Sequence, residues 1–434
     1  MSTLDGYIPM TGFDDLWVWS DETSSKRLEW YRAVAENRLP AKFRIAGTIP
    51  VDVDLEQDSE ENLWAELNRG TIQLSKRREA IRTGQAELGP KARRPHLLDL
   101  CLELSRRMLR HCNFCAWDCR VDRAQGTKLG TCKLDHGTRV STYFHHIGEE
   151  LIYRGTKGSG TIFFTSCNMR CAFCQNGDIS TDKDNGTTVT PRTLATMAWL
   201  LRMEGCHNIN WVGGDPIIHL HTIVEAISIL TDNMAPPSDQ DLEQALSTKS
   251  DYLFKMAPET INGLFQDEFN APMLWNSNFF ASSEAMKILR LLIDVWLPDF
   301  KFGPGRCGIK LARTSRYWET VTRNLALIEE WREDATIRHL VMPNHVECCT
   351  YPVIDWVAEN MPEIQINLMD QYHPEMFTNP LGSKYQPKYE SLSRRPNDQE
   401  ILAAYRYARS KGVAFESVTL ETPPENPRLA NICG

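Results

Sequence analysis

Three cysteines in a short span constrain this chain most. Cys167, Cys171 and Cys174 follow the spacing Cys-x3-Cys-x2-Cys. Iron–sulfur clusters are held by cysteine thiolates that normally come in fours, so three thiolates can hold a [4Fe–4S] cube and leave one iron open for a substrate. A zinc ion is the alternative. Zinc needs a fourth nearby ligand, however, and the next Cys or His after Cys174 is Cys206.

The cysteine spacing resembles the signature of the radical S-adenosylmethionine (radical SAM) superfamily. The resemblance includes Phe173, which directly precedes the third cysteine and in that family lies near the adenine. It implies that the open iron binds the amino and carboxylate groups of SAM. It further implies that an electron from a ferredoxin or flavodoxin cleaves SAM to methionine and a 5′-deoxyadenosyl radical, which removes a hydrogen atom from a substrate.

Composition favours an intracellular enzyme. With 434 residues, 42% of them hydrophobic, the chain can bury a barrel-sized core plus something smaller. We expect no signal peptide and no membrane span. Thirteen cysteines are then better explained by metal ligation in a reducing cytoplasmic compartment than by disulfides. The net charge of −9 and the pI of 5.7 argue against a nucleic-acid partner.

Apolar periodicity divides the chain into two regions. Residues 28–110 are charged and predict helices at 58–74 and 96–110. After about residue 155, six predicted strands alternate with helices, which indicates an α/β fold with a parallel sheet. The predicted strands are 161–165, 208–212, 272–276, 293–297, 336–342 and 364–369, and the predicted helices are 191–204, 216–230, 282–292, 317–331 and 351–360.

The radical SAM resemblance implies that these strands and helices form a partial (β/α)6 barrel. We therefore expect a helical N-terminal extension over residues 1–110, a small cysteine-rich metal knuckle over 111–154, and the barrel over 155–434 with an insertion near 233–270.

Residues at the ends of the predicted strands are candidate ligand contacts, because ligands of such sheets sit at the carboxyl ends of the strands. Gly213, Gly214 and Asp215 follow the second strand and resemble the Gly-Gly-Glu-Pro motif of radical SAM enzymes, with Asp in place of Glu. Glycines let a ligand approach the backbone, and carbonyls there can accept hydrogen bonds from the SAM ammonium group. The alternative is an ordinary glycine turn into a helix that begins at Pro216.

Asp299 and Lys301 end the fourth predicted strand. Residues two apart on an extended segment point to the same face, so both side chains can reach one ligand. A carboxylate beside an ammonium group matches the zwitterionic amino-acid end of SAM. The alternative is a solvated surface pair of little energetic value, which the flanking apolar residues disfavour.

Six segments occur in the same order in a family related to pyruvate formate-lyase activating enzymes. The likeness runs from about residue 111 to near the C-terminus. It implies that Asp299 and Lys301 contact SAM, that Arg338 faces the adenosyl pocket, and that His373 lies near the nucleoside. The segment from about 233 to 270 is longer than usual in that family, which fits a lid, a partner-docking flap or a solvent-side decoration. The six matching segments are 158–164, 171–176, 207–211, 296–301, 337–341 and 367–372.

A second set of cysteines consists of Cys112, Cys115, Cys119 and Cys132. Four thiolates can fill a tetrahedral metal site, and related proteins carry the same pattern. Spacing does not separate zinc from an auxiliary [4Fe–4S] cluster, and free buried thiols are a further alternative. The other cysteines show no ligand pattern and are interpreted as small core or surface residues; they are Cys101, Cys206, Cys307, Cys348, Cys349 and Cys433.

Three classes of function follow from these motifs. The family resemblance favours an activase that makes a glycyl radical on a partner enzyme. The second class is a radical SAM enzyme that modifies another peptide, a nucleic acid or a small molecule. The third is a non-catalytic iron–sulfur electron-transfer protein, which is disfavoured because an electron carrier has no need for Gly213, Gly214, Asp299 and Lys301.

Overall fold

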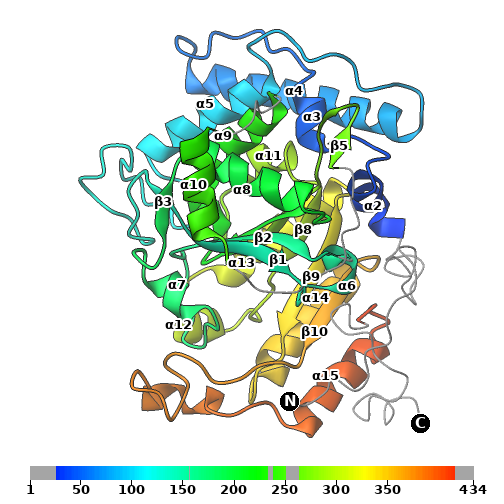
Figure 1. Ribbon diagram of the computed structural model, residues 1–434. Coiled ribbons are helices and arrows are strands. Elements are labelled where there is room, and N and C mark those ends of the chain that lie inside the picture. Colours follow the sequence, from blue (N-terminus) through cyan, green and yellow to red (C-terminus); the bar gives the residue numbers. More distant parts are fainter. Residues whose placement is uncertain (1–25, 156, 233–237, 251–262, 416–434) are drawn as a thin grey trace.

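One eight-stranded sheet sets the architecture (Figure 1). The computed structural model describes residues 26–155, 157–232, 238–250 and 263–415. The sheet has the order β10-β9-β8-β7-β4-β2-β1-β3. Six parallel strands neighbour one another in chain order: β2 (Ser159–Phe164), β4 (Ile209–Gly213), β7 (Met273–Ser277), β8 (Val295–Pro298), β9 (Asp334–Leu340) and β10 (Gln365–Met369). This order never reverses, so crossovers of one hand place their helices on one face. The predicted α/β partial barrel with a mostly parallel sheet is confirmed.

The crossover helices begin where the sequence supplies caps. Thr190 Oγ1 accepts a hydrogen bond from Thr193 N at the start of α8, and Ser282 Oγ accepts one from Ala285 N at the start of α11. All six predicted strands and five predicted helices begin and end within two residues of the observed ones. The helices are α8 (Pro191–Met203), the turn η2 (Pro216–His219) with α9 (Leu220–Thr231), α11 (Ser283–Arg290), α13 (Tyr317–Glu330) and α14 (Tyr351–Asn360).

Further elements lie between these units or follow them. They are α6 (Leu151–Arg154), α7 (Gly177–Thr181), α12 (Cys307–Ala312), the turns η3 (Val346–Thr350) and η4 (Pro387–Leu392), and α15 (Asp398–Ser410).

Two antiparallel strands extend the sheet beyond β2. β1 (Thr138–His146) pairs with β2, and β3 (Thr187–Val189) pairs with β1. Neither strand was predicted from the sequence. β1 is half-buried along most of its length, so its sequence lacks the apolar run that marks the parallel strands.

The two faces of the sheet differ in chemistry. Trp211, Trp275 and Trp296 lie side by side across β4, β7 and β8 and are fully buried. Because side chains alternate along a strand, Asn210 and Asn276 point to the opposite face. There both amides donate to Glu149 Oε2, at 2.7 and 3.4 Å. The interior of the partial barrel is therefore partly polar.

The N-terminal segment closes one end of this interior. It forms α2 (Glu29–Ala35), α3 (Lys42–Ala46), α4 (Glu60–Arg82) and α5 (Leu97–Arg110), and Figure 1 shows α4 and α5 stacked over α3 and α9. Tyr31 of α2 and Tyr153 of α6 pack against Leu274, Val295 and Leu297 of the sheet. None of the helices in the described ranges is long and apolar enough to cross a bilayer.

The insertion near 233–270 is described in part. Residues 233–237 and 251–262, which include Tyr252, lie outside the described residues. Within the described part, α10 (Asp239–Thr248) packs on α8. Phe265 lies in the short hairpin of β5 (Leu264–Phe265) and β6 (Glu268–Phe269), and its carbonyl accepts a hydrogen bond from Arg44. These described parts cover outer helices and the N-terminal segment.

Candidate metal and cofactor site

The loop that carries Cys167, Cys171 and Cys174 follows β2 and is held by distant segments. Arg170 N and Ala172 N donate to the carbonyls of Ala312 and Leu311 at the end of α12, at 3.1 and 2.7 Å. Backbone donors and acceptors of a loop must be paired somewhere, and α12 supplies two of the partners. The three cysteines are thereby brought to one end of the barrel.

Gly213 and Gly214 allow β4 to approach this loop. Gly213 has φ +124°, and a Cβ there would lie 2.2 Å from Phe164 N; a Cβ on Gly214 would lie 1.5 Å from Ser166 O. Gly214 N donates to Phe164 O (2.8 Å) and Asp215 N donates to Ser166 O (3.0 Å). The two glycines are therefore required for strand–loop packing next to Cys167.

Asp215 and Asn278 connect the ends of β4 and β7 to the cysteine loop. Asp215 accepts hydrogen bonds from Ser277 Oγ (3.0 Å), Asn278 N (2.9 Å) and Ile217 N (3.0 Å), while burial raises its pKa to about 6. Asn278 Nδ2 donates to Cys167 Sγ at 3.5 Å. The Asp215 carboxylate thus orders the backbone, whereas Asn278, which the sequence analysis missed, contacts a sulfur atom.

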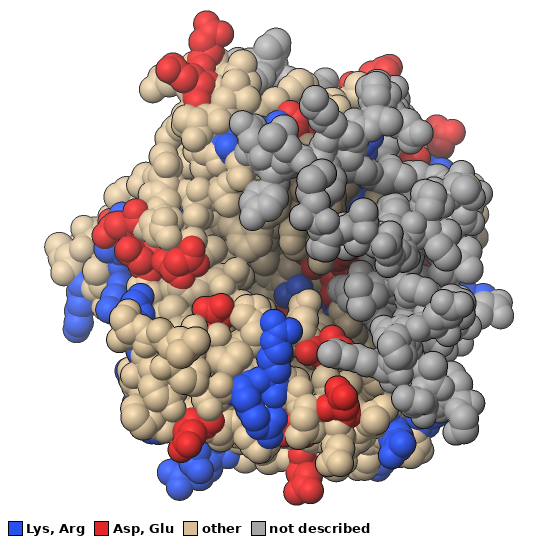
Figure 2. All heavy atoms as spheres, turned by 60° about the horizontal axis from the view of Figure 1, so that its bottom comes forward, with Lys and Arg blue, Asp and Glu red and all other residues tan. Residues whose placement is uncertain are grey.

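A cavity of about 390 Å³ lies at the carboxyl ends of the parallel strands. Figure 2 shows a hollow near the centre of one face, with acidic and basic atoms visible inside it. The volume is within the range of small-molecule sites. Ten of the eleven residues proposed from the sequence for the cluster and SAM line the cavity, His373 being the exception: Cys167, Cys171, Phe173, Cys174, Gly213, Gly214, Asp215, Asp299, Lys301 and Arg338.

Asp299, Lys301 and Arg338 form one charged cluster in this cavity. Lys301 Nζ donates to Asp299 Oδ2 (2.6 Å), and Arg338 Nε donates to Asp299 Oδ1 (3.0 Å). Burial opposes ionisation of Asp299, but the two cations outweigh it and hold the pKa of Asp299 below its usual value. The three groups are charged and mostly screened from solvent, so they differ from a surface pair.

A pair of buried glutamates on the turn after β1 completes the wall. Arg338 Nη1 donates to Glu149 Oε1 at 3.3 Å, and Asn367 Nδ2 donates to Glu150 Oε1 at 3.0 Å. Burial and the adjacent charge of Glu149 raise the pKa of Glu150. On Glu149, His146 and Arg338 outweigh burial and lower the pKa. This pair was not predicted from the sequence, although two consecutive glutamates next to the apolar residues of α6 were a visible signal.

Phe173 lines the cavity, whereas His373 does not. Phe173 packs against Phe302 and Tyr372, with ring centroids 6.0 and 6.1 Å away. His373 is absent from the described lining and is partly exposed; its Nδ1 accepts a hydrogen bond from Gln175 Nε2 at 3.2 Å. His373 therefore contacts two residues of the cavity lining, Gln175 and Gln371, without lining the cavity itself.

The second cysteine set lies in a folded segment next to the cavity loop. Cys112 N donates to Val121 O (2.9 Å), and Cys119 Sγ lies 3.6 Å from Thr131 Oγ1. Cys112, Cys115 and Cys132 are buried. Among the described residues, the donor atoms of these four cysteines do not form a group within 4.8 Å of one another. A metal at this place stays a prediction.

One interpretation from the sequence was wrong. Cys307, Cys348 and Cys349 are not isolated core or surface residues, because they lie together with His345. Cys307 is 41 residues from Cys348 along the chain, so their proximity depends on the loops after β8 and β9 being neighbours. No local pattern reveals the contact with Cys307, although His345, Cys348 and Cys349 lie within five positions of one another and were a visible signal.

The residues around the main cavity fit an iron–sulfur cluster. Three thiols from one loop line the wall, and its described lining contains no fourth cysteine. An amide donor is aimed at the Cys167 sulfur, and such hydrogen bonds tune iron–sulfur clusters. Burial raises the pKa of Cys167 and Cys171, so binding of a metal must displace protons from these thiols.

Comparison with known proteins identifies the class. The radical SAM superfamily model matches residues 161–266, so the chain carries a radical SAM domain. This superfamily implies a [4Fe–4S] cluster and SAM. The chain is also 33% identical over 388 residues to uncharacterized protein MJ0674 of Methanocaldococcus jannaschii, an alignment covering 88% of this chain and 97% of the relative. The chain belongs to the same family as this archaeal protein.

Solved structures that match part of this chain include SuiB and anSMEcpe. Streptococcus suis SuiB bound to its precursor peptide SuiA is 10% identical, with a TM-score of 0.35, and the match covers 57% of this chain and 44% of SuiB. Native anSMEcpe with bound AdoMet is 13% identical, with a TM-score of 0.34, and the match covers 58% of this chain and 61% of that chain. This chain thus spans less than two thirds of either.

The glycine packing predicts the effect of adding one methyl group. We expect Gly214→Ala to lower the free energy of unfolding by about 1–3 kcal/mol or more, because its Cβ would displace the Ser166 carbonyl. Gly305→Ala is the matched control, since nothing lies within 4 Å of its Cβ position. Urea denaturation of both variants measures the difference, and equal stability would contradict the packing argument.

The raised pKa of Glu150 predicts a pH-dependent loss of stability. The folded state holds a proton on Glu150 above the pH at which an unfolded glutamate, with a pKa of about 4.3, releases it. Wild-type stability should therefore fall as the pH rises through the folded pKa. Glu150→Gln cannot ionise and keeps the oxygen that accepts from Asn367, so its advantage over wild type should grow with pH.

Urea denaturation at a series of pH values tests this sign. The control is Glu149→Gln, which removes a carboxylate whose pKa is lowered and should be destabilising at neutral pH. Parallel pH curves for Glu150→Gln and wild type would show that Glu150 is ionised in the folded protein.

Proposed function

We propose that this chain is a radical SAM enzyme that holds a [4Fe–4S] cluster through Cys167, Cys171 and Cys174 and cleaves SAM reductively. The observation that carries the proposal is the convergence of three thiols and the charged cluster of Asp299, Lys301 and Arg338 on one cavity. An iron–sulfur protein that only carries electrons has no need for a cavity with charges of both signs beside its cysteines.

The residues that line the cavity have different roles. Bound together, the cluster and SAM supply a 5′-deoxyadenosyl radical. The Lys301 ammonium and the Asp299 carboxylate offer charges complementary to the carboxylate and ammonium ends of the methionyl moiety. Asn278 donates to the Cys167 sulfur. Phe173 provides an apolar wall and helps exclude water from the cavity.

Arg338 fixes the position of this charge pattern. Its guanidinium joins Asp299 on β8's extension to Glu149 on the turn after β1. A charged group that is held by several partners needs no reorganisation when a ligand arrives. Arg338 is therefore a positioning residue for Asp299 as well as part of the cavity wall.

We further propose that the substrate is a protein partner, on which the chain makes a glycyl radical. The support is the resemblance of six segments to the family related to pyruvate formate-lyase activating enzymes. A ferredoxin or flavodoxin is the proposed electron donor. Radical modification of another peptide or a small molecule is the alternative, and a nucleic-acid substrate is disfavoured by the net charge of −9.

The cluster proposal predicts SAM cleavage that depends on three cysteines. Anaerobically reconstituted protein with dithionite and SAM should release 5′-deoxyadenosine, measured by liquid chromatography. The variant with Cys167, Cys171 and Cys174 all changed to Ala should release none, because it has no ligands for the iron. Cys206→Ala, at a buried position outside the cavity, is the control that should retain activity.

Undiminished cleavage by the triple variant would overturn the assignment. If cleavage is confirmed, electron paramagnetic resonance after addition of a glycyl radical enzyme tests the finer proposal. A radical signal on that partner supports an activase, whereas uncoupled cleavage with every such partner favours the alternative substrates.

The charged cluster predicts a specific loss of SAM affinity. Lys301→Ala should weaken SAM binding by about 1.5–3 kcal/mol, the range for a hydrogen bond to a charged group, while iron content stays unchanged. Lys310→Ala, at an exposed position of α12, is the matched control. Calorimetric titration of reconstituted protein gives both affinities, and equal values would assign Lys301 a purely structural role.

A further inference from the structure

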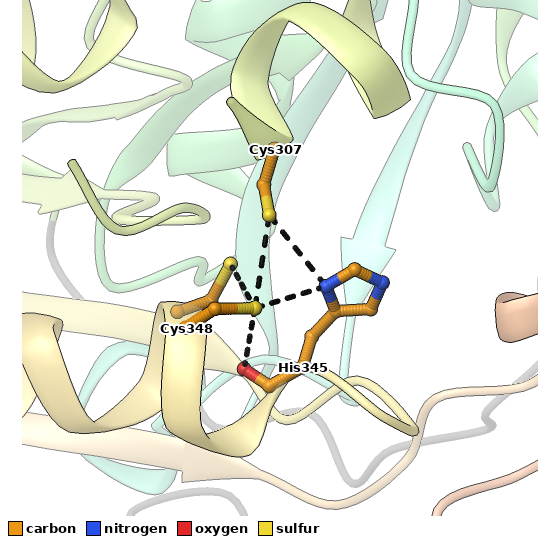
Figure 3. A group of neighbouring side chains, drawn as sticks. Cys307, His345 and Cys348 are labelled. Atoms are coloured by element: carbon orange, nitrogen blue, oxygen red, sulfur yellow. Dashed lines mark hydrogen bonds between the residues drawn. The ribbon is translucent and has the colours of Figure 1, made fainter. Parts of the chain in front are cut away.

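A second group of metal-binding side chains lies outside the main cavity. Cys307 is the first residue of α12, His345 directly precedes η3, and Cys348 and Cys349 are part of η3. Figure 3 shows the sulfur atoms of Cys307 and Cys348 and the imidazole of His345 pointing toward one another. Among the described residues, this is the one group of three or more Cys, His, Asp or Glu donors whose atoms all lie within 4.8 Å.

The distances in this group match a single tetrahedral ion. Zinc binds thiolate sulfur at about 2.3 Å and imidazole nitrogen at about 2.0–2.1 Å, so tetrahedral geometry places two sulfurs about 3.8 Å apart and a sulfur and a nitrogen about 3.6 Å apart. Cys307 Sγ lies 3.7 Å from Cys348 Sγ, which lies 3.9 Å from Cys349 Sγ. His345 Nδ1 lies 3.6 Å from Cys307 Sγ and 3.3 Å from Cys348 Sγ.

The same distances disfavour an iron–sulfur cube. In a cube each cysteine binds a different iron, so the ligand sulfurs must be farther apart than around one shared ion. Three thiolates and one imidazole form the Cys3His set of structural zinc sites, and sulfur with imidazole suits zinc among the divalent metals. Three thiols within one group of four side chains are also unlike an ordinary surface patch.

We propose that Cys307, His345, Cys348 and Cys349 bind one zinc ion in a closed structural site. The site has an entry path, because Cys348 is exposed whereas Cys349 is fully buried. The assignment is independent of the [4Fe–4S] proposal, since it uses none of the cavity residues.

This ion would fix the supports of the main cavity. Cys307 starts α12, and the other end of α12 accepts the hydrogen bonds of Arg170 and Ala172 in the cysteine loop. The segment that follows Lys301 packs tightly on η3, which carries Cys348 and Cys349. At Gly303 in this segment, a Cβ atom would lie only 2.2 Å from Cys348 O. Zinc at this place therefore joins the loop after β8 to the loop after β9.

Metal analysis in a background without the main cluster tests the site. Full-length protein with Cys167, Cys171 and Cys174 changed to Ala is compared with the same protein carrying Cys307→Ser and Cys348→Ser in addition. We expect the second protein to contain about one zinc ion less per chain, whatever metal the Cys112 set holds. Adding Cys206→Ala in place of the two serines is the matched control and should leave the zinc content unchanged.

Thiol alkylation of the unmutated protein covers the case in which the serine variant does not fold. Mass spectrometry should find Cys307 and Cys348 protected in the zinc-loaded protein and alkylated after treatment with a chelator. Four outcomes would overturn the proposal: an unchanged zinc content, loss of iron and sulfide instead of zinc, alkylation that is independent of the chelator, or a Cys307–Cys348 disulfide in the isolated protein.

Discussion

Backbone hydrogen bonds to the cysteine loop are the constraint on which the cavity depends. Between β2 and α7 this loop has no helix or strand, so its polar backbone groups need partners elsewhere. The end of α12, the end of β4 and the segment around Phe377 supply them, the last through Phe377 N, which donates to Ala172 O at 3.0 Å. Three parts of the chain that are far apart in sequence thus fix where the three thiols point.

Charge pairing is the second constraint on the cavity. A buried charge without a partner is costly, and the interior contains Asp299, Lys301, Arg338 and Glu149 in one connected group. Each ion has a counter-ion, which makes the group tolerable before any ligand binds. The same arrangement offers both signs of charge on one wall, so an uncharged ligand would gain little from it while a zwitterion gains at both ends.

The sequence could predict those features that depend on local pattern. The six parallel strands carry apolar runs, and residues at the ends of strands converge because parallel strands end on the same edge. Asp299 and Lys301 were found in this way, whereas Arg338, which lies within β9, was named from the family resemblance. β1 was missed because most of its residues are only half-buried, so its sequence has no apolar run. Asn278 and Cys307 were missed because their roles arise from contacts between segments, which no spacing within one segment reveals. Glu149 with Glu150, and His345 with Cys348 and Cys349, lie close together in the sequence and were visible local signals.

The two ends of the barrel interior are filled differently, and the N-terminal segment contributes to one of them. A sheet of six parallel strands does not close on itself, so its interior needs a filling. At the amino ends of the strands, Tyr31 and Tyr153 pack against Leu274, Val295 and Leu297, and Tyr153 donates a hydrogen bond to Thr336 Oγ1 at 2.7 Å. This group of side chains excludes water from the interior at the amino ends of the strands. The carboxyl ends are left free to form the polar cavity. Helices α2 and α6 therefore fill, in this open barrel, space that further strands would enclose in a closed one.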